Sequence, residues 1–195
     1  GESPQPYTEE DAPAPLNVYG ASKLEGERAV EAVGGRYLVL RTSWIYGLRG
    51  ANFLLTMLRL AHEREELRIV DDQIGAPTWS RMLAEVTSVL LGRALADPEL
   101  LDERAGLYHV SAAGQTSWYG FARRILDEVQ LGAEARFKTL RAISSSEYPT
   151  PAARPHNSRL SNARLAKEFG IALPPWDATL ALCLGDLEAL AARQG

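Results

Sequence analysis

The apolar segment RYLVLRTSWIYG at residues 36–47 constrains the fold most. So continuous an apolar stretch is typical of a strand buried in a parallel sheet. The preceding residues 17–33 place apolar side chains at helical spacing, with Asn17 as the expected N-cap and a Gly-Gly pair as the stop. A helix joined to a buried strand by so short a connection indicates an α/β fold.

The same alternation continues to the end of the chain. Helices are expected over residues 51–65, 79–95, 117–130 (capped by Thr116), 161–168 and 177–193, strands over 67–71, 106–112 and 136–143, and loops over 72–78 and 144–160. The predicted fold class is α/β: the C-terminal part of a Rossmann-like, doubly wound parallel sheet plus a small mixed α/β substrate-binding lobe. We expect an extended lead-in over 1–16, a sheet portion over 17–75 and mainly the lobe over 76–195.

Composition narrows the class of partner and compartment. The 195 residues carry 21 basic and 25 acidic side chains, and no Lys/Arg-rich block suggests binding to nucleic acid or to an anionic membrane. A single cysteine, Cys183, and three scattered histidines give neither a disulfide nor a zinc-ligand spacing, so no metal is expected. With neither a leader pattern nor a long apolar stretch, the sequence predicts a cytoplasmic protein.

A glycine-rich phosphate-binding turn is missing. A dinucleotide-binding sheet opens with a strand, a GxGxxG or GxxGxxG turn and a helix, and neither pattern occurs in this sequence. Residues 1–16 instead hold four prolines and four acidic residues, which favours an extended loop. We therefore expect the chain to be the later part of a nucleotide-binding protein.

Tyr19 and Lys23 are the candidate catalytic pair. They stand four residues apart on the predicted helix, so they share one face. A neighbouring ammonium favours the phenolate and lowers the pKa of a phenol, which can then exchange a proton with a ketone or an alcohol. Seven tyrosines and three lysines in 195 residues give roughly 0.1 such pairs by chance, so an exposed helix pair is the alternative interpretation.

The motifs around this pair resemble one enzyme family. YGASKLEGE, RTSWIYG, DDQIGAPT, GLYHVSAAGQTSWYGFA, ARPHNSRLSNARL and LPPW, in this order, are similar to the dTDP-4-dehydrorhamnose reductases of the extended short-chain dehydrogenase/reductase family. The resemblance covers almost the whole chain. It implies reduction of the C4 ketone of dTDP-4-dehydro-L-rhamnose to dTDP-L-rhamnose by NADPH, with NADH left open. A glycine-rich half and a Ser or Thr beside the catalytic Tyr would precede residue 1.

The resemblance also assigns roles near the cofactor. It makes Tyr19 the proton donor to the C4 oxygen, and Lys23 the group that lowers the Tyr19 pKa and holds the nicotinamide ribose. Thr42 and Ser43 would lie beside the nicotinamide. Trp44 would pack against the sugar ring as an apolar plate, with an ordinary core aromatic as the alternative.

Other residues are candidates for substrate binding. Asn52 and Phe53 open the next helix, where the resemblance places the diphosphate, although Asn52 is equally suited to be a simple N-cap. Gln73 and Arg154 lie in family-like loops, and an Arg suits a diphosphate, yet both are also ordinary surface-loop residues. The aromatic side chains of Trp79, Trp118 and Tyr119 near helix starts are interpreted as packing.

Two further functions stay open at this level. One is a non-catalytic regulatory subunit on the same fold, of the type that partners methionine adenosyltransferase. The other is a reductase or epimerase of another nucleotide sugar. The intact Tyr19 and Lys23 pair favours catalysis, because a binding module does not need a tuned phenol. A homodimer is also open, since sequence amphipathicity does not separate a partner from the chain's own sheet.

Overall fold

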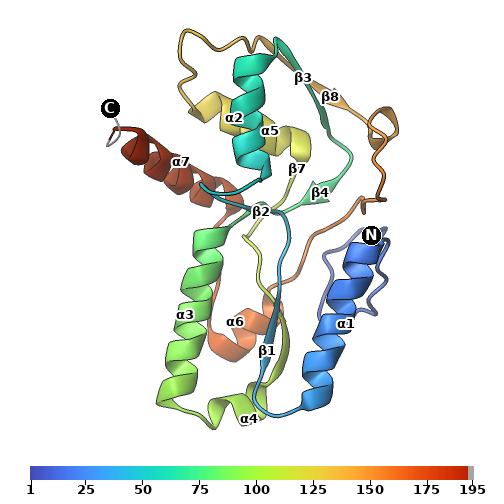
Figure 1. The fold of residues 1–195 in the computed structure, drawn as a ribbon. Coiled ribbons are helices and arrows are strands. Elements are labelled where there is room, and N and C mark those ends of the chain that lie inside the picture. The colour runs from blue at the N-terminus through green and yellow to red at the C-terminus, as the bar shows by residue number, and fades with distance from the viewer. Residues whose placement is uncertain (193–195) are drawn as a thin grey trace.

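The computed structural model of the protein describes residues 1–192 and has an α/β architecture (Figure 1). The helices are α1 (Val18–Val33), α2 (Phe53–Glu63), α3 (Ser80–Ala96), α4 (Leu100–Arg104), α5 (Trp118–Glu128), α6 (Ala163–Phe169) and α7 (Trp176–Ala192), with a 3-10 turn η1 (Ser145–Glu147). The strands are β1 (Leu38–Arg41), β2 (Ile45–Tyr46), β3 (Glu66–Val70), β4 (Ile74–Gly75), β5 (Thr78–Trp79), β6 (Gly106–His109), β7 (Thr116–Ser117) and β8 (Thr139–Ile143). Arg193, the last residue of the final predicted helix, lies outside the described residues.

The strands pair in four two-stranded sheets, of which three are parallel. β1 pairs with β6, β2 with β5 and β3 with β8 in parallel, whereas β4 and β7 are antiparallel. In Figure 1, β3 and β8 lie at the opposite end of the molecule from β1, with α2 and α5 beside them. The expected α/β class with parallel strands is confirmed.

Several local expectations need correction. The apolar segment at 36–47 is not one strand, because Trp44 takes a left-handed backbone (φ 49°) that separates β1 from β2. The expected loop 72–78 contains β4 and the first residue of β5. Helix α4 was not predicted. The cap of α5 is Ser117 and not Thr116, since the Ser117 hydroxyl accepts the Gly120 N–H at 2.9 Å.

Two hydrophobic clusters form most of the core. The larger joins α2, α5, α7, β2 and β5, and its members include Tyr46, Leu54, Met57, Trp79, Phe121, Ile125, Leu180 and Leu184. The other joins α3, α6 and β6 through Val86, Leu90, Tyr108, Val110, Leu165 and Phe169. Of the elements around the cleft described below, α2 and α5 belong to the larger cluster, and Ile69 of β3 packs against it.

Residues 1–16 are extended, as expected, but they are hydrogen-bonded to a distant loop. Tyr7 donates its N–H to the Arg159 carbonyl at 2.9 Å and accepts from the Ser161 N–H at 2.7 Å. The Asn157 amide, which is buried, donates to the Ser3 and Gln5 carbonyls. The N-terminal segment is thus bonded along residues 157–161 and is more than a free lead-in.

Helix α1 lies on the surface and has no buried residue. Two contacts fix its position: Asn17 caps its first turn, and the Glu27 carboxylate receives two hydrogen bonds from the Arg41 guanidinium at the end of β1.

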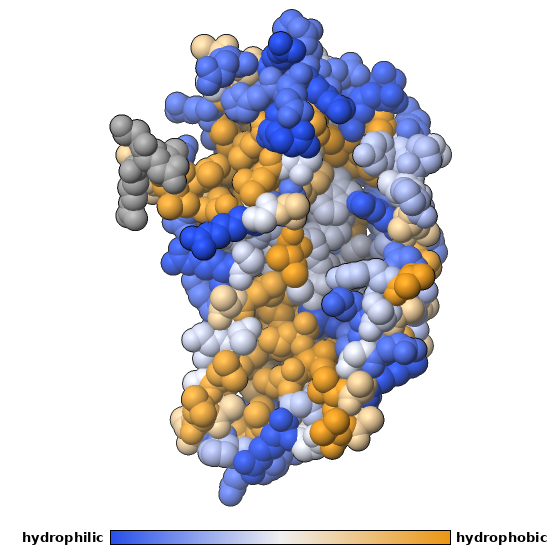
Figure 2. Space-filling model, viewed as in Figure 1, coloured by the Kyte–Doolittle hydropathy of each residue, from blue (hydrophilic) through white to orange (hydrophobic). Residues whose placement is uncertain are grey.

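Figure 2 shows apolar surface along the middle of this face of the molecule. Within residues 1–192, no helix combines the length and apolarity that crossing a bilayer requires.

Gly92 gives a direct test of the α3 assignment. It lies inside the exposed part of α3, and a Cβ added there would meet no atom within 4 Å. We expect Gly92→Ala to raise the free energy of unfolding by about 0.5–1 kcal/mol, because alanine loses less backbone entropy in a helix. Urea denaturation checks this, and a destabilised variant would contradict the helical assignment.

Candidate active site

Tyr19 and Lys23 lie together on the first two turns of α1. The Lys23 Nζ atom is 5.5 Å from the centroid of the Tyr19 ring, and the tyrosine is 71% exposed. The Asn17 side chain accepts the Gly20 N–H at 2.9 Å and donates to the Ala153 carbonyl at 3.1 Å. The N-cap therefore fixes the start of the helix and also ties it to the loop that carries Arg154.

Thr42 and Ser43 follow β1 at its carboxyl end. Helix α1 runs antiparallel to β1, so the Tyr19 end of the helix and the Thr42 end of the strand lie at the same end of the pair (Figure 1). The Thr42 and Ser43 hydroxyls are buried and, among residues 1–192, have no hydrogen-bond partner. Buried hydroxyls without partners are uncommon, so they are well suited to bind a polar group of a ligand.

A cleft of about 490 Å³ lies between α2, β3 and the loop after β8. Its apolar wall is formed by side chains of α2, β3, β8 and the start of α5, namely Phe53, Met57, Leu60, Ile69, Ile143 and Trp118. Its polar wall is formed by Arg64, Arg68, Gln73, Glu147, Tyr148, Thr150 and Arg154. Three of the predicted substrate-binding residues, Phe53, Gln73 and Arg154, are thus brought together.

Gln73 and Arg154 differ in how they are held. The Gln73 amide is buried and donates to the Ser145 hydroxyl at 2.9 Å, and Ser145 donates in turn to the Asp72 carboxylate. Burial opposes ionisation of Asp72, but the hydrogen bonds from Ser145 hold the pKa of that carboxyl below its usual value. In contrast, the exposed Arg154 guanidinium makes no hydrogen bond or ion pair within residues 1–192 and is available to an anion.

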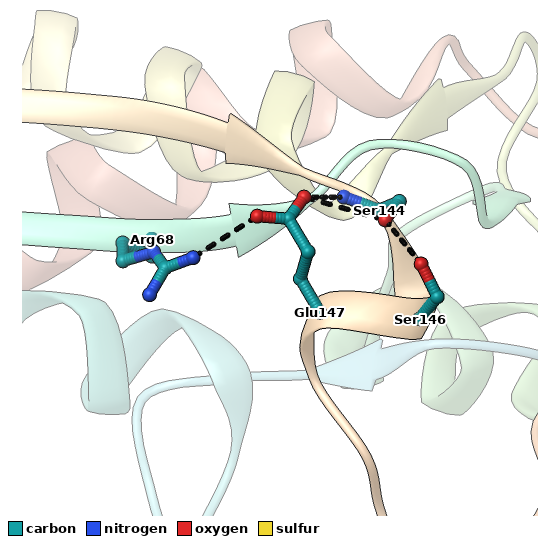
Figure 3. Close-up of polar contacts among 4 residues, drawn as sticks. All are labelled: Arg68, Ser144, Ser146 and Glu147. Carbon is teal, nitrogen blue, oxygen red and sulfur yellow. Dashed lines mark hydrogen bonds and ion pairs between the residues drawn. The ribbon is translucent and has the colours of Figure 1, made fainter.

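Glu147, in the turn after β8, lines the cleft. Figure 3 shows the polar contacts of this turn. The Glu147 carboxylate accepts the Ser144 N–H at 3.0 Å and pairs with the Arg68 guanidinium at 3.1 Å. The Ser144 N–H is the main reason that the Glu147 pKa is lowered, with Arg68 contributing less. The Ser144 and Ser146 hydroxyls are 2.7 Å apart, so the turn is bonded internally before any ligand arrives.

Trp44 does not line this cleft. Its indole stacks on that of Trp118, with centroids 3.6 Å apart and planes 9° apart. A Cβ on Gly75 would overlap the Trp44 ring, 2.8 Å from Cδ2 and Cζ2. Because the two indoles are only 3.6 Å apart, Gly75 cannot lie between them. Gly75 therefore covers the face of the Trp44 ring opposite Trp118. Both faces of the Trp44 ring are thus covered within the chain, and the sugar contact that the resemblance implied stays a prediction.

Sequence reasoning missed Trp118 as a residue of the cleft. Trp118 packs on Phe53 at 4.6 Å and on Trp44, so the packing role expected of it is present, but it also lines the cleft. A signal existed in the sequence, because the tripeptide Thr-Ser-Trp occurs at both 42–44 and 116–118. Nothing local shows that these two copies stack.

Asn52 has a structural role in this conformation. Its side-chain oxygen accepts the Leu55 N–H at 3.2 Å, and its amide donates to the carbonyls of Gly47 and Arg49. This is the N-cap alternative that the sequence left open. Its polar atoms are occupied within the chain, so the Asn52 side chain does not face the cleft as a free group.

His109 connects the sheet to the N-terminal segment. Its ring is 1% exposed, with Nδ1 donating to the Tyr7 carbonyl at 3.2 Å, and its backbone N–H donates to Glu9 at 2.8 Å. Burial lowers the His109 pKa, the Glu9 carboxylate opposes this and the Arg41 guanidinium adds to it. With Tyr19 and Arg41, His109 lines a second hollow of about 360 Å³.

No cluster of three or more metal-ligating side chains occurs in residues 1–192.

The lowered His109 pKa predicts a pH dependence of stability. The unfolded imidazole binds a proton near its ordinary value of 6.5, whereas the folded one resists it. The unfolded state is then favoured as the pH falls, so we expect stability to decrease from about pH 7.5 through 6.5 and level off below the folded pKa. Asp72, whose pKa is lowered, loses its stabilising contribution only as the pH falls below its ordinary value of 3.8, outside this range.

Urea unfolding measured across that pH range tests this. In His109→Gln the amide can still donate to the Tyr7 carbonyl, but the side chain no longer titrates. We expect the variant to lose this part of the pH dependence. A slope identical to that of the unchanged protein would assign the effect to other groups.

Comparison with known proteins places this arrangement in a family. The model of the RmlD substrate binding domain matches residues 1–189. The chain belongs to the RmlD substrate binding domain family. The match includes α1 with its Tyr19 and Lys23 pair, the cleft, and residues 1–16, so the N-terminal segment is part of the RmlD domain.

Several curated relatives of this RmlD chain are named dTDP-4-dehydrorhamnose reductase. It is 48% identical over 190 residues to a dTDP-4-dehydrorhamnose reductase of Burkholderia thailandensis, covering 96% of this chain and 64% of that protein. It is 44% identical over 188 residues to the dTDP-4-dehydrorhamnose reductase of Escherichia coli K12, covering 96% and 62%. The chain therefore spans less than two thirds of the length of these relatives.

Solved structures support the same fold. The chain is similar to a dTDP-4-dehydrorhamnose reductase of Bacillus anthracis crystallised with NADP, with a TM-score of 0.83 at 36% identity over 95% of this chain and 61% of that one. A reductase of the same name from Clostridium acetobutylicum gives 0.82 at 33% identity, over 96% and 62%. The RmlD domain of this protein thus has the Rossmann-like α/β fold of these structures, as the sequence predicted.

Proposed function

We propose that this chain is the catalytic-helix and substrate-binding portion of an NADPH-dependent reductase. The reaction is reduction of the C4 ketone of dTDP-4-dehydro-L-rhamnose to dTDP-L-rhamnose. The observation that carries the proposal is the exposed Tyr19 and Lys23 pair at the start of α1. This end of α1 lies beside the end of β1, where two buried hydroxyls have no hydrogen-bond partner within residues 1–192. The names of the relatives supply the substrate and the reaction.

Tyr19 supplies the proton in this scheme. As the ketone carbon gains a hydride, its oxygen gains negative charge, and the Tyr19 hydroxyl donates its proton to that oxygen. The Lys23 ammonium beside the ring stabilises the phenolate that remains. NADPH, when bound, supplies the hydride.

Thr42, Ser43 and Lys23 fit the nicotinamide end of such a cofactor. The two buried hydroxyls lack partners within residues 1–192, so a carboxamide beside them would complete their hydrogen bonding. Lys23 carries the donors that a ribose hydroxyl needs. The Bacillus anthracis relative was crystallised with NADP, which favours NADPH over NADH.

The cleft fits a nucleotide diphosphate sugar. The Arg154 guanidinium on its rim is free to pair with a diphosphate, for which its two-pronged geometry is suited. Phe53 and Trp118 offer an apolar wall for a sugar or a base, and the Gln73 amide lies next to it. At Asn52 the backbone at the start of α2, and not the side chain, is what we assign to ligand binding. The polar atoms of the Asn52 side chain are bonded within the chain.

Two further properties belong to this proposal. A biosynthetic reductase that draws on NADPH is expected in the cytoplasm. A homodimer remains a prediction, and light scattering of the purified protein decides it by giving twice the chain mass or the single mass.

The test is NADPH oxidation followed by absorbance, with dTDP-4-dehydro-L-rhamnose and the full-length gene product that carries this chain. We expect turnover with this substrate, and slower turnover when NADH replaces NADPH. Other dTDP- or UDP-linked 4-ketosugars serve as specificity controls. Nucleotide-sugar binding without turnover would reject the reductase and favour the regulatory alternative, and faster turnover of another ketosugar would reassign the substrate.

A further inference from the structure

One loop of the protein borders both the cleft and the hollow beside Tyr19. In the loop of residues 148–155, Arg154 lines the cleft, whereas the next residue, Pro155, lines the second hollow together with Tyr19. The proposed reaction uses both places at once, because the diphosphate is assigned to Arg154 and the ketone to Tyr19. Catalysis therefore depends on what holds the loop in place relative to α1.

A hydrogen bond from Asn17 joins the 148–155 loop to α1. The Asn17 side-chain amide donates to the Ala153 carbonyl at 3.1 Å, across 136 positions of the sequence, while the Asn17 side-chain oxygen accepts the Gly20 N–H at 2.9 Å. A carbonyl on one side and an N–H on the other leave a single orientation for the amide. Asn17 thus bonds the loop to the helix turn that carries Tyr19.

Capping alone does not require asparagine at this position. Serine and aspartate cap helices as well as asparagine does, but aspartate has no donor and the serine hydroxyl is one bond shorter than the amide. Asn52, which caps α2, donates its amide to the carbonyls of Gly47 and Arg49, five and three residues away. The Asn17 amide instead bonds a segment far along the chain, which is a function separate from the cap.

The loop is stiff enough to transmit this constraint to Arg154. Prolines fix three of its eight φ angles, at Pro149, Pro151 and Pro155. Directly after the loop, the His156 Nδ1 atom donates to the Asp72 carbonyl at 3.0 Å, and the His156 carbonyl accepts the Ile74 N–H at 2.7 Å. The chain is therefore bonded to the β4 side of the cleft just after Arg154 and to α1 just before it.

We propose that Asn17 is a positioning residue for the reduction. Its amide holds the 148–155 loop against α1, so that a substrate bound through its diphosphate to Arg154 presents its ketone to Tyr19. The exposed Arg154 guanidinium makes no hydrogen bond or ion pair within residues 1–192, so its place is set by the loop backbone. The role rests on the proposed function, because the substrate and the proton donor come from there.

The hold on the loop can be tested without any ligand. In Asn17→Ser the hydroxyl still caps α1 but is too short to bond the Ala153 carbonyl. Nitrogen-15 relaxation of the full-length gene product should then give lower order parameters for the amides of residues 152–154, at an unchanged melting temperature. Arg36→Gln is the matched control, because it breaks an exposed ion pair with Asp102 beyond the other end of α1. Unchanged order parameters in Asn17→Ser would overturn the proposal, whatever the protein reduces.

The positioning role is tested by kinetics with dTDP-4-dehydro-L-rhamnose and by calorimetry with dTDP. We expect Asn17→Ser to lower kcat about 10-fold, because a small misplacement of the ketone is costly. The KM and the Kd for dTDP should rise less than about 2-fold, since Arg154 itself is unchanged. Arg36→Gln should leave all three constants as they are.

A double-mutant cycle tests the link between the two places. Arg154→Ala alone should raise KM and the Kd for dTDP at least about 10-fold and also lower kcat, because it removes the anchor of the diphosphate. Combined with Asn17→Ser, it should lower kcat by a smaller factor than it does alone, because the bond that connects the loop to α1 is already missing.

The outcomes separate this role from the proposed function. If kcat of Asn17→Ser stays within about 2-fold of normal, or if the two substitutions lower kcat by independent factors, the loop does not position the ketone and the inference is overturned. A Kd for dTDP raised as much as in Arg154→Ala, with kcat unchanged, would make Asn17 a binding residue instead. If the unchanged protein neither binds dTDP nor reduces the ketosugar, the proposed function fails and the positioning role fails with it. The order parameters still decide whether Asn17 holds the loop.

Discussion

Replacement of Tyr19 by phenylalanine is expected to lower kcat for NADPH-dependent ketone reduction about 10²–10⁴-fold, the range typical of a lost general acid. The phenyl ring keeps the apolar body of the side chain and removes only the hydroxyl that would donate the proton. Tyr19 is 71% exposed and makes no side-chain hydrogen bond within residues 1–192, so the fold has no need of that hydroxyl. KM should therefore change much less than kcat.

Steady-state kinetics of the full-length gene product measures this effect. Tyr37→Phe is the matched control, because it removes the same atom just before β1 and should leave kcat unchanged. Lys23→Met should also lower kcat, because the phenolate left after proton donation loses its neighbouring cation. Activity within about 2-fold of normal in Tyr19→Phe would remove Tyr19 from the mechanism.

Replacement of Phe121 by alanine is expected to lower the free energy of unfolding by about 3–5 kcal/mol. Phe121 is fully buried in the larger core cluster, where its ring contacts Tyr46 at 5.2 Å, Phe53 at 5.4 Å and Trp176 at 6.0 Å between centroids. Alanine would leave a cavity among these rings. Since Phe53 also lines the cleft, nucleotide-sugar binding should weaken as well.

Urea denaturation of the 195-residue chain measures the stability loss. Leu95→Ala is the control, because Leu95 in α3 is 82% exposed and its truncation should change stability by less than about 0.5 kcal/mol. Phe121→Leu, which refills most of the volume, should lose less than Phe121→Ala. A loss below about 1 kcal/mol in Phe121→Ala would mean that this cluster is not the core of the protein.

Local sequence patterns predicted the helices well. Asn17 caps α1 and Asn52 caps α2 as the sequence suggested, because a cap depends on a side chain and an N–H only three residues apart. The spacing of Tyr19 and Lys23 likewise determines that they share a face, whatever the rest of the chain does. The family motifs added the proposed substrate and cofactor, which residue patterns alone do not supply.

Non-local contacts decided what the sequence left open. The 1–16 segment bonds to residues 157–161, across some 150 positions, and no local periodicity predicts that contact. The break between β1 and β2 arises from the left-handed backbone of Trp44, which is held by Thr78, Gly75 and Trp118.

The sequence by itself determined the α/β class, the Asn17 and Asn52 caps and the Tyr19 and Lys23 pair, because each depends on neighbours within a few residues. The tertiary structure alone decided which aromatic ring faces the cleft. Trp44 and Trp118 stand in the same Thr-Ser-Trp tripeptide, yet one is covered on both faces and the other lines the cleft. The difference comes from a glycine 31 positions beyond Trp44 and from the pairing of β4 with β7, which no short-range pattern encodes.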